Sequence, residues 1–230
     1  MKVALIPARG GSKRIPRKNI KKFCGKPIIG YSVEAAIKSG LFDRVVVSSD
    51  DQEIIDIACS YGAEAPFIRP SELSDDFATT TDVTLHAINT LNLKFTDQIC
   101  CIYATAPFIR DIDLKSAYTL LMSEKLDYVF SATEYRFPIQ RALKINFDGF
   151  SEMFQKEHET TRSQDLEPAF HDAGQFYFGT VQAYLEGKGV LTNSKSKPLM
   201  LPSSKTQDID TLNDWEFAEA LYLADQLNDQ

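Results

Sequence analysis

Short apolar runs alternate with amphipathic stretches along the first 130 or so residues of the chain. Runs of β-branched and other apolar residues predict buried strands, whereas apolar residues that recur every three or four positions predict helices. The predicted strands cover residues 3–6, 44–49, 62–67, 97–102 and 127–132, and the predicted helices cover residues 28–39, 52–61, 82–91 and 114–123. This alternation favours an α/β fold, in which a mostly parallel sheet carries helices on both faces.

Proline, glycine and aspartate mark the ends of two of these helices. Pro27 precedes helix 28–39 and Gly40 follows it, an arrangement typical of a helix start and stop. Asp50 lies before helix 52–61, where its carboxylate can accept hydrogen bonds from the first backbone N–H groups. We therefore expect Asp50 to cap that helix, with a metal site at Asp50 and Asp51 as the weaker alternative.

The alternation lapses after residue 133 and resumes near the C-terminus. The lapse consists of one or two irregular strands within 135–154, a turn at 146–149 and a polar stretch at 155–169. Further strands are predicted at 174–179 and 199–202, followed by a helix at 213–226 with an apolar stripe of Trp215, Ala218, Leu221 and Tyr222. We expect one domain, residues 1–230, in which 135–172 form an inserted excursion that closes over a substrate or packs against a second subunit.

Composition narrows the class of protein. The chain of 230 residues is 43% hydrophobic and 25% charged, which is ordinary for a soluble globular protein. It has no run of about 18 apolar residues and starts without a signal-peptide pattern, so we expect a cytoplasmic protein with no membrane partner. The net charge of −7 argues against a nucleic-acid partner. Irregular spacing predicts reduced thiols in or near the core for Cys24, Cys59, Cys100 and Cys101, the last two on opposite faces of one strand.

The first predicted strand leads into the most strongly charged stretch of the chain. Between Arg9 and Lys22 there are seven Lys or Arg residues and no acidic residue, although the chain as a whole is acidic. Gly10 and Gly11 allow a sharp turn that brings backbone N–H groups close to an anion, and Ser12 adds a hydroxyl donor. Like charges at this density repel one another unless they are solvated or hold a polyanion. We therefore predict a phosphate-binding loop.

This loop matches neither common phosphate-binding motif. Ile15 stands five residues after Gly10, where a Walker loop requires glycine, and the pattern Gly-x-Gly-x-x-Gly is absent. The alternative interpretation is a basic surface loop, including one that touches nucleic acid.

A second candidate site lies near the C-terminus, at Asp208 and Asp210. Residues two apart in an extended chain share a face, so both carboxylates can converge on one cation while Ile209 faces the core. Hard oxygen ligands suit Mg²⁺, which also bridges substrate phosphates. The alternative is that Asp210 caps the helix that follows.

The excursion and the strand after it carry polar groups suited to a sugar that bears a carboxylate. Arg can hold a carboxylate through two parallel hydrogen bonds, so Arg141 and Arg162 are the candidate clamps. His171 adjoins Asp172, but neighbours on a strand face opposite ways, which disfavours a catalytic pair. The wider set of candidates is Lys144, Gln164, His171, Asp172, Gln175, Phe137, Phe176 and Tyr177.

Residues 6–13, Ile-Pro-Ala-Arg-Gly-Gly-Ser-Lys, followed by Lys-Asn-Ile at 18–20, resemble the signature of the cytidylyltransferases that activate nonulosonic (sialic-type) acids as CMP-sugars. The resemblance covers the whole chain and is closest to the pseudaminic acid branch. The further segments that carry it are 104–108, 137–143, 162–165, 171–177 and 207–210. It implies a CTP-dependent nucleotidyltransferase with a Rossmann-like fold of the nucleotide-diphospho-sugar transferase type.

The resemblance also implies roles for individual residues. Arg9, Ser12 and Lys13 would hold the CTP phosphates, and Lys18, the catalytic residue with Arg9, would stabilise the α-phosphate and leaving group. The full CTP-binding set is Ala8, Arg9, Gly10, Gly11, Ser12, Lys13, Lys18, Asn19, Arg69 and Thr80, with Arg69 and Thr80 at the cytosine. Asp208 and Asp210 would bind Mg²⁺. The family is typically dimeric, and the excursion would complete the partner's sugar pocket.

One position departs from the family pattern. Tyr103 stands where sialic acid synthetases usually have a sugar-facing glutamine, which disfavours N-acetylneuraminate as the substrate. The hypothesis is therefore that the anomeric hydroxyl of pseudaminic acid attacks the α-phosphorus of CTP and releases pyrophosphate. The alternatives are another acid, namely N-acetylneuraminate, legionaminate or an octulosonate, or a non-catalytic nucleotide-binding protein.

Overall fold

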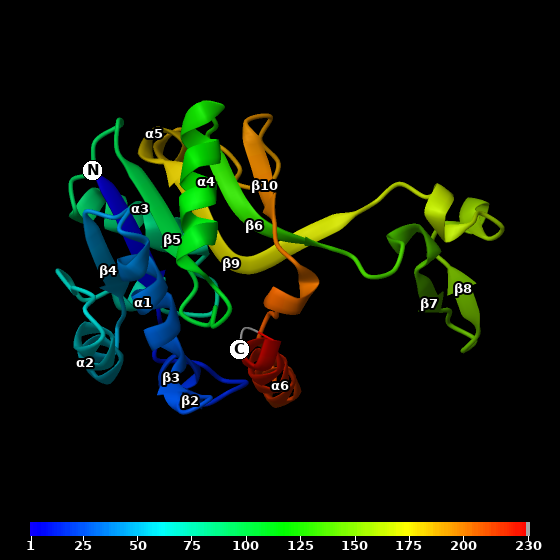
Figure 1. Cartoon of the computed structure of the whole chain (residues 1–230), viewed down its shortest axis with the longest axis horizontal. Helices are drawn as coiled ribbons and strands as arrows, with labels where there is room; N and C mark the ends of the chain where they lie inside the picture. Colours follow the sequence, from blue (N-terminus) through cyan, green and yellow to red (C-terminus); the bar gives the residue numbers. More distant parts are fainter. Residues whose placement is uncertain (229–230) are drawn as a thin grey trace.

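A six-stranded sheet forms the centre of the computed structural model, which describes residues 1–228 (Figure 1). The strand order is β10-β6-β9-β5-β1-β4. Neighbours pair in parallel except β9, which runs antiparallel to both β5 and β6. The strands are β1 (Lys2–Pro7), β4 (Arg44–Ser48), β5 (Gln98–Ile102), β6 (Tyr128–Glu134), β9 (Phe170–Thr180) and β10 (Ser196–Met200). The predicted α/β fold with a mostly parallel sheet is confirmed.

Helices cover both faces of this sheet because its strands are apolar on both sides. Residues 3–6 of β1 are fully buried, and Cys100 and Cys101 of β5 lie in different core clusters, as predicted. The helices α1 (Ile28–Ser39), α2 (Gln52–Ser60) and α4 (Asp111–Ser123) pack into one core, and α3 (Thr80–Thr90) and α5 (Val181–Leu185) pack into the other. Among the described residues, no helix has the length and apolarity needed to cross a membrane.

The predicted ends of α1 are confirmed by its caps. Pro27 stands at the N-cap and Gly40 adopts the left-handed conformation at φ 62°, which a side chain would disfavour. The cap predicted for α2 is wrong. Asp51, not Asp50, accepts the hydrogen bond from the Ile54 N–H, because Asp50 instead accepts from the backbone of the basic loop.

The strand predicted at 62–67 is also wrong. This segment forms only a single bridge from Val46 to Glu64, and turns and a short 3₁₀ helix, η2 (Ser71–Leu73), lead from there to α3. The segment still lies along the edge of the sheet, because Arg44 holds the carboxylate of Glu64 through two hydrogen bonds of 2.6 and 2.8 Å. The prediction that Cys59 lies in or near the core is also wrong, because Cys59 is exposed.

The C-terminal helix α6 (Leu212–Asn228) packs on the start of the chain. Trp215 and Ala218 of the predicted stripe are buried, and Leu221 and Tyr222 pack beside them. Their partners belong to the basic loop and to β2 (Lys22–Phe23), which pairs with β3 (Lys26–Pro27). The Phe23 and Trp215 ring centroids lie 5.6 Å apart. Burial of this stripe therefore brings the segment just before α6 next to the basic loop.

Residues 135–169 form an arm that extends away from the sheet between β6 and β9 (Figure 1). The arm contains an antiparallel pair, β7 (Leu143–Ile145) and β8 (Ser151–Met153), joined by a turn with Gly149 at φ 86°. Its short 3₁₀ helices are η3 (Ile139–Arg141), η4 (Lys156–His158) and η5 (Ser163–Asp165). Large apolar side chains of the arm are exposed, namely Phe137, Leu143, Ile145, Phe147, Phe150 and Phe154.

Candidate active site

A cavity of about 620 Å³ opens at the carboxyl end of β1. Ligands of open α/β sheets bind at this edge, so the cavity is the first candidate for a nucleotide site. Its walls come from the basic loop, from η1 (Lys18–Ile20), from the start of α3 and from the segment after β5. The sequence-predicted residues that line it are Arg9, Ser12, Lys13, Lys18, Asn19, Arg69, Thr80 and Tyr103.

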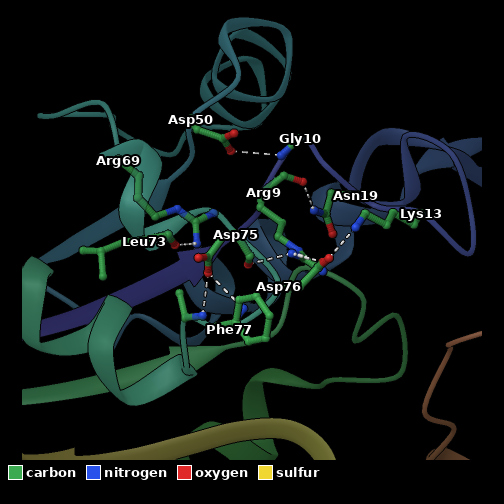
Figure 2. Close-up of polar contacts among 11 residues, drawn as sticks. Arg9, Gly10, Lys13, Asn19, Asp50, Arg69, Leu73, Asp75, Asp76 and Phe77 are labelled. Carbon is green, nitrogen blue, oxygen red and sulfur yellow. Dashed lines mark hydrogen bonds and ion pairs between the residues drawn. The ribbon is translucent and has the colours of Figure 1, made fainter.

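The backbone of the basic loop is fixed against its neighbours. The N–H of Ala8 donates to Ser48 O at 2.9 Å, and the amide of buried Asn19 donates to Arg9 O at 2.9 Å. The N–H of Gly10 donates to Asp50 at 2.9 Å, so it is directed at a carboxylate rather than into open space (Figure 2). A Cβ on Gly10 would lie 2.8 Å from Asp51 Oδ2, which explains why glycine is needed there.

Arg17 anchors this loop to α2. Its backbone is left-handed at φ 55°, an uncommon conformation for arginine, and its guanidinium pairs with Asp51 and with Glu53. The pairing with Arg17 holds the pKa of the Asp51 carboxyl below its usual range. The sequence carries no local signal for this structural role, because Arg17 is one of seven cations between Arg9 and Lys22.

Two of the cations that line the cavity, Arg9 and Lys13, share one carboxylate (Figure 2). Arg9 Nη1 donates to Asp76 Oδ1 at 2.7 Å and to the backbone oxygen of Asp75 at 2.7 Å, and Lys13 Nζ donates to Asp76 Oδ2 at 2.5 Å. Lys13, and then Arg9, hold the pKa of Asp76 below its ordinary value. Nothing in the sequence pointed to Asp76, because the contact joins segments more than 60 residues apart.

Lys18 connects the basic loop to the aspartate pair. Its Nζ donates to Ile209 O at 2.7 Å and lies 3.5 Å from Asp210 Oδ1, and Arg14 also pairs with Asp210 at 2.7 Å. Ile209 is fully buried, so the residues on either side of it face outward. The structure therefore brings Lys18 into contact with Ile209 and Asp210, although 191 positions separate Lys18 from Ile209.

Asp208 faces a second cavity, of about 470 Å³, whose lining includes His171 and Arg136. Partial shielding from water, and then the negative charge of Asp210, raise the pKa of the Asp208 carboxyl. Within residues 1–228, no cation lies within ion-pair distance of Asp208, whereas Asp210 has two. A carboxylate that is repelled by a neighbouring carboxylate and lacks its own cation is suited to a divalent ion.

The donor set fits magnesium rather than zinc. In the described part of the chain, no three histidine, cysteine, aspartate or glutamate side chains cluster as a metal site. Two carboxylates alone are few ligands for a structural metal, but Mg²⁺ commonly takes one or two carboxylates and completes its shell with water and substrate phosphate. Asp208 and Asp210 therefore fit an ion that is bound together with a polyphosphate.

Arg69 is buried in the cavity wall with unsatisfied donors. Only 5% of the residue is exposed, and its Nε and Nη2 have no hydrogen-bond partner, while Nη1 reaches Leu73 O at 3.5 Å (Figure 2). Desolvation lowers the pKa of this guanidinium. Unpaired buried donors are costly, and a ligand with acceptor atoms would satisfy them. Nearby, Thr80 Oγ1 lies 3.2 Å from the hydroxyl of Tyr103.

Tyr177 packs against Tyr103. The Tyr103 and Tyr177 rings have centroids 5.4 Å apart, and Tyr177 donates its hydroxyl proton to Asp172 at 2.5 Å. Burial raises the pKa of Tyr177 well above its ordinary value, so its hydroxyl stays protonated. Tyr177 and Asp172 also line a small cavity of about 150 Å³ behind Thr80.

The other predicted sugar-binding residues are dispersed. Gln175 is 2% exposed and donates to Lys205 O, so it holds η6 (Ser203–Lys205) instead of lining either large cavity. His171 lines the second cavity, and its ring lies 4.7 Å from that of Tyr135. Five candidates belong to the arm and line neither large cavity, namely Phe137, Arg141, Lys144, Arg162 and Gln164. Phe176 is fully buried in the core.

Comparisons with known proteins agree on one family. A family model described as "Cytidylyltransferase" matches residues 3–197. The chain is 50% identical to a pseudaminic acid cytidylyltransferase of Campylobacter jejuni, over 96% of this chain and 95% of that protein. It is 31% identical to a CMP-N,N'-diacetyllegionaminic acid synthase of Legionella pneumophila, over 95% of each chain. It is 34% identical to N-acylneuraminate cytidylyltransferase A of Danio rerio, over 94% of this chain but only 49% of that protein.

Two solved structures share the fold at low sequence identity. A CMP:2-keto-3-deoxy-manno-octonic acid synthetase complexed with CTP superposes with a TM-score of 0.70 at 17% identity, covering 97% of this chain and 99% of that one. A 4-diphosphocytidyl-2C-methyl-D-erythritol synthase from Anaerococcus prevotii superposes with a TM-score of 0.66 at 16% identity, covering 97% and 96%.

Proposed function

Because this chain belongs to the cytidylyltransferase family, we propose that it transfers CMP from CTP to the anomeric hydroxyl of pseudaminic acid and releases pyrophosphate. The observation that carries this proposal is the contact of Lys18 with Ile209 and Asp210, which joins the cationic loop of the first cavity to the carboxylate pair beside the second. Such a pairing of charges suits a metal-bound triphosphate. The choice of sugar is supported by the 50% identity to the C. jejuni relative.

The cavity can orient CTP from both ends. Arg69, with its unpaired donors, and Thr80 would bind the cytosine end, because their side chains lie at the inner wall. The loop from Ala8 to Lys13, together with Asn19, would hold the phosphates, with Arg9, Ser12 and Lys13 as the side-chain donors. Fixing both ends of the nucleotide presents its α-phosphorus to a nucleophile, which is where positioning lowers the barrier most.

Lys18 and Arg9 would carry the electrostatic part of the reaction. The sugar hydroxyl oxygen attacks the α-phosphorus in line, the bond to the β-phosphate oxygen breaks, and negative charge builds on the departing pyrophosphate. A fixed cation beside that charge stabilises the transition state more than the ground state. Asp208 and Asp210 would hold Mg²⁺, which neutralises charge on the triphosphate when bound.

The sugar would lie beyond Tyr103. Tyr103, Tyr177 and His171 line the neighbouring cavities and offer ring faces and hydroxyl groups to a nine-carbon acid. Tyr103 has no side-chain amide with which to bind an N-acylneuraminate, which favours a different nine-carbon acid as the substrate. Gln175 acts indirectly in this proposal, by holding η6 beside Asp208.

The arm would serve as the dimer contact. Phe147 and Ile145 are at least four-fifths exposed, which is unusual for apolar side chains unless another surface covers them. We propose a homodimer in which Arg141, Arg162 and Gln164 of one arm complete the sugar site of the other subunit. Phe147→Glu should shift the mass measured by light scattering from dimer to monomer, and Phe95→Glu, at a 60% exposed position outside the arm, should not.

A panel of substrates tests the proposed reaction. The protein is incubated with CTP, Mg²⁺ and one of four acids, namely pseudaminate, legionaminate, N-acetylneuraminate or an octulosonate. The pyrophosphate released is then measured. We expect the highest kcat/KM with pseudaminate. A higher value with another acid would change the substrate and keep the enzyme class. Binding of CTP without pyrophosphate from any of the four would favour a non-catalytic nucleotide-binding protein.

A further inference from the structure

Asp76 occupies the place at which the phosphate-binding cations meet. Each of its two carboxylate oxygens accepts a hydrogen bond from one cation: Oδ1 accepts from Arg9 and Oδ2 accepts from Lys13 (Figure 2). Two acceptor oxygens that are held by an arginine and a lysine reproduce the pattern by which these side chains hold a phosphate group. The cations that the proposed function gives to the nucleotide are therefore already paired when no nucleotide is bound.

The segment that carries Asp76 is firmly held at both ends and loosely held at its tip. At one end, Ser74 Oγ donates to Pro70 O at 3.0 Å, and at the other, Thr79 and Asp82 form the reciprocal cap of α3. Between them, Asp75 accepts the N–H groups of residues 77 and 78 and so forms a turn of its own. Phe77, next to Asp76, is 89% exposed, so it adds little apolar packing to the tip.

The contacts between this tip and the basic loop are exchangeable. The Asp76 side chain is 41% exposed and that of Lys13 is 79% exposed, and ion pairs at such exposure contribute little net stability. A triphosphate carries more negative charge than one carboxylate and can also reach Lys18 and Ser12 in the same cavity. A phosphate and the Asp76 carboxylate would repel each other if both lay between Arg9 and Lys13, so one must leave.

We propose that Asp76 is a displaceable stand-in for a nucleotide phosphate. In the empty protein it neutralises Arg9 and Lys13 within a loop whose charges otherwise repel one another, and residues 74–79 swing away when a triphosphate takes its place. This inference rests on the proposed function, in which Arg9 and Lys13 bind phosphate. It adds an internal competitor, encoded in the chain, that weakens nucleotide binding.

Calorimetric titration with inorganic triphosphate and with CTP tests the competition. Asp76→Asn removes the competing charge, so both ligands should bind about three- to tenfold more tightly than to the wild type. Glu157→Gln makes the same change in net charge at an exposed site in the arm and should leave both affinities within about twofold. An unchanged or weakened affinity of Asp76→Asn for both ligands would overturn the proposal. A weakened affinity would indicate instead that Asp76 holds the basic loop in its binding conformation. If neither ligand binds even the wild type, the proposed function fails first.

A reporter at the tip tests the movement itself. Phe77→Trp places an exposed indole beside Asp76, whereas the native Trp215 is buried. Inorganic triphosphate should change the fluorescence of Phe77→Trp along the same isotherm as calorimetric binding. The double variant with Asp76→Asn should show binding with a smaller change, because its tip has lost both ion pairs and keeps only the hydrogen bond from Arg9 to Asp75 O. Binding without any change in the single variant would contradict the swing.

Discussion

Replacing Lys18 with alanine should lower the rate of the chemical step far more than it lowers the affinity for CTP. Lys18 Nζ is held 2.7 Å from Ile209 O and 3.5 Å from Asp210, and its side chain is only 19% exposed. The ammonium is therefore fixed between the basic loop and Asp210, where the proposed function puts the α-phosphate of CTP. A charge fixed in advance needs no reorganisation when the transition state forms.

The size of the effect follows from distance and dielectric. Two unit charges about 3 Å apart at an effective dielectric constant of about 20 interact by roughly 5–6 kcal/mol, and much of this attraction exists already in the ground state. The part that appears only in the transition state is of the order found for a single oxyanion-binding donor, about 3–4 kcal/mol. We therefore expect kcat to fall by about 100- to 1,000-fold. The Kd for CTP should rise by less than about tenfold, since Arg9 and Lys13 remain.

Pyrophosphate release under saturating substrates gives kcat, and calorimetry gives the Kd for CTP. Lys22→Ala is the matched control, because Lys22 belongs to the same basic stretch, is exposed and does not line the cavity. Thermal unfolding of both variants separates loss of the hydrogen bond to Ile209 O from loss of catalysis. A Lys18→Ala enzyme with unchanged kcat would remove Lys18 from the transition state.

Three further predictions concern the loop, the metal and the sheet edge. Gly10→Ala should weaken CTP binding in calorimetry by about tenfold, because the new Cβ would lie 2.8 Å from a carboxylate oxygen of Asp51. Gly11→Ala is the control and should change the affinity less than twofold, because its new Cβ meets nothing within 4 Å. Equal effects of the two substitutions would be inconsistent with the packing. Asp208→Asn should raise the Mg²⁺ concentration for half-maximal pyrophosphate release by at least about tenfold, and an unaltered Mg²⁺ curve would exclude Asp208 as a ligand. Glu64→Gln should lower Tm at pH 7 by about 1–3 °C. The hydrogen bonds from Arg44 lower the pKa of the Glu64 carboxyl. The pair therefore stabilises the fold at pH values above 4.5, the ordinary pKa of glutamate, and this stabilisation is lost as the pH falls below that value. A Tm difference between the variant and the wild type that persists in strong acid would argue against this cause.

The elements with local signals were predictable, and those that depend on distant contacts were not. The bounds of α1 follow from Pro27 and Gly40, which act within the helix itself. The choice between Asp50 and Asp51 as the cap of α2 depends on Gly10, whose N–H donates to Asp50 from the loop after the neighbouring strand β1. Pattern alone contains no information on that competition.

The same distinction holds within the candidate site. The comparisons confirm the family that residues 6–13 and 18–20 predict. It was predictable because each of these two segments is continuous in sequence and chemically distinctive. Asp76 and Arg17 escaped notice, since an aspartate in a polar turn and one arginine in a basic stretch carry no local signal. The motif around Gln175 predicts a sugar ligand, but Gln175 is buried and donates to Lys205 O, a contact between residues 30 positions apart that has no local signal.

The central claim is that the anomeric oxygen of the sugar acid becomes bonded to the α-phosphorus of CTP. Pseudaminic acid labelled with ¹⁸O at its anomeric hydroxyl, turned over once with CTP and Mg²⁺, tests this claim by ³¹P NMR and mass spectrometry of the products. We predict that the label is retained in the bridging position of the CMP-sugar and that the pyrophosphate is unlabelled. Label in the pyrophosphate, or a CMP-sugar without label, would contradict the account.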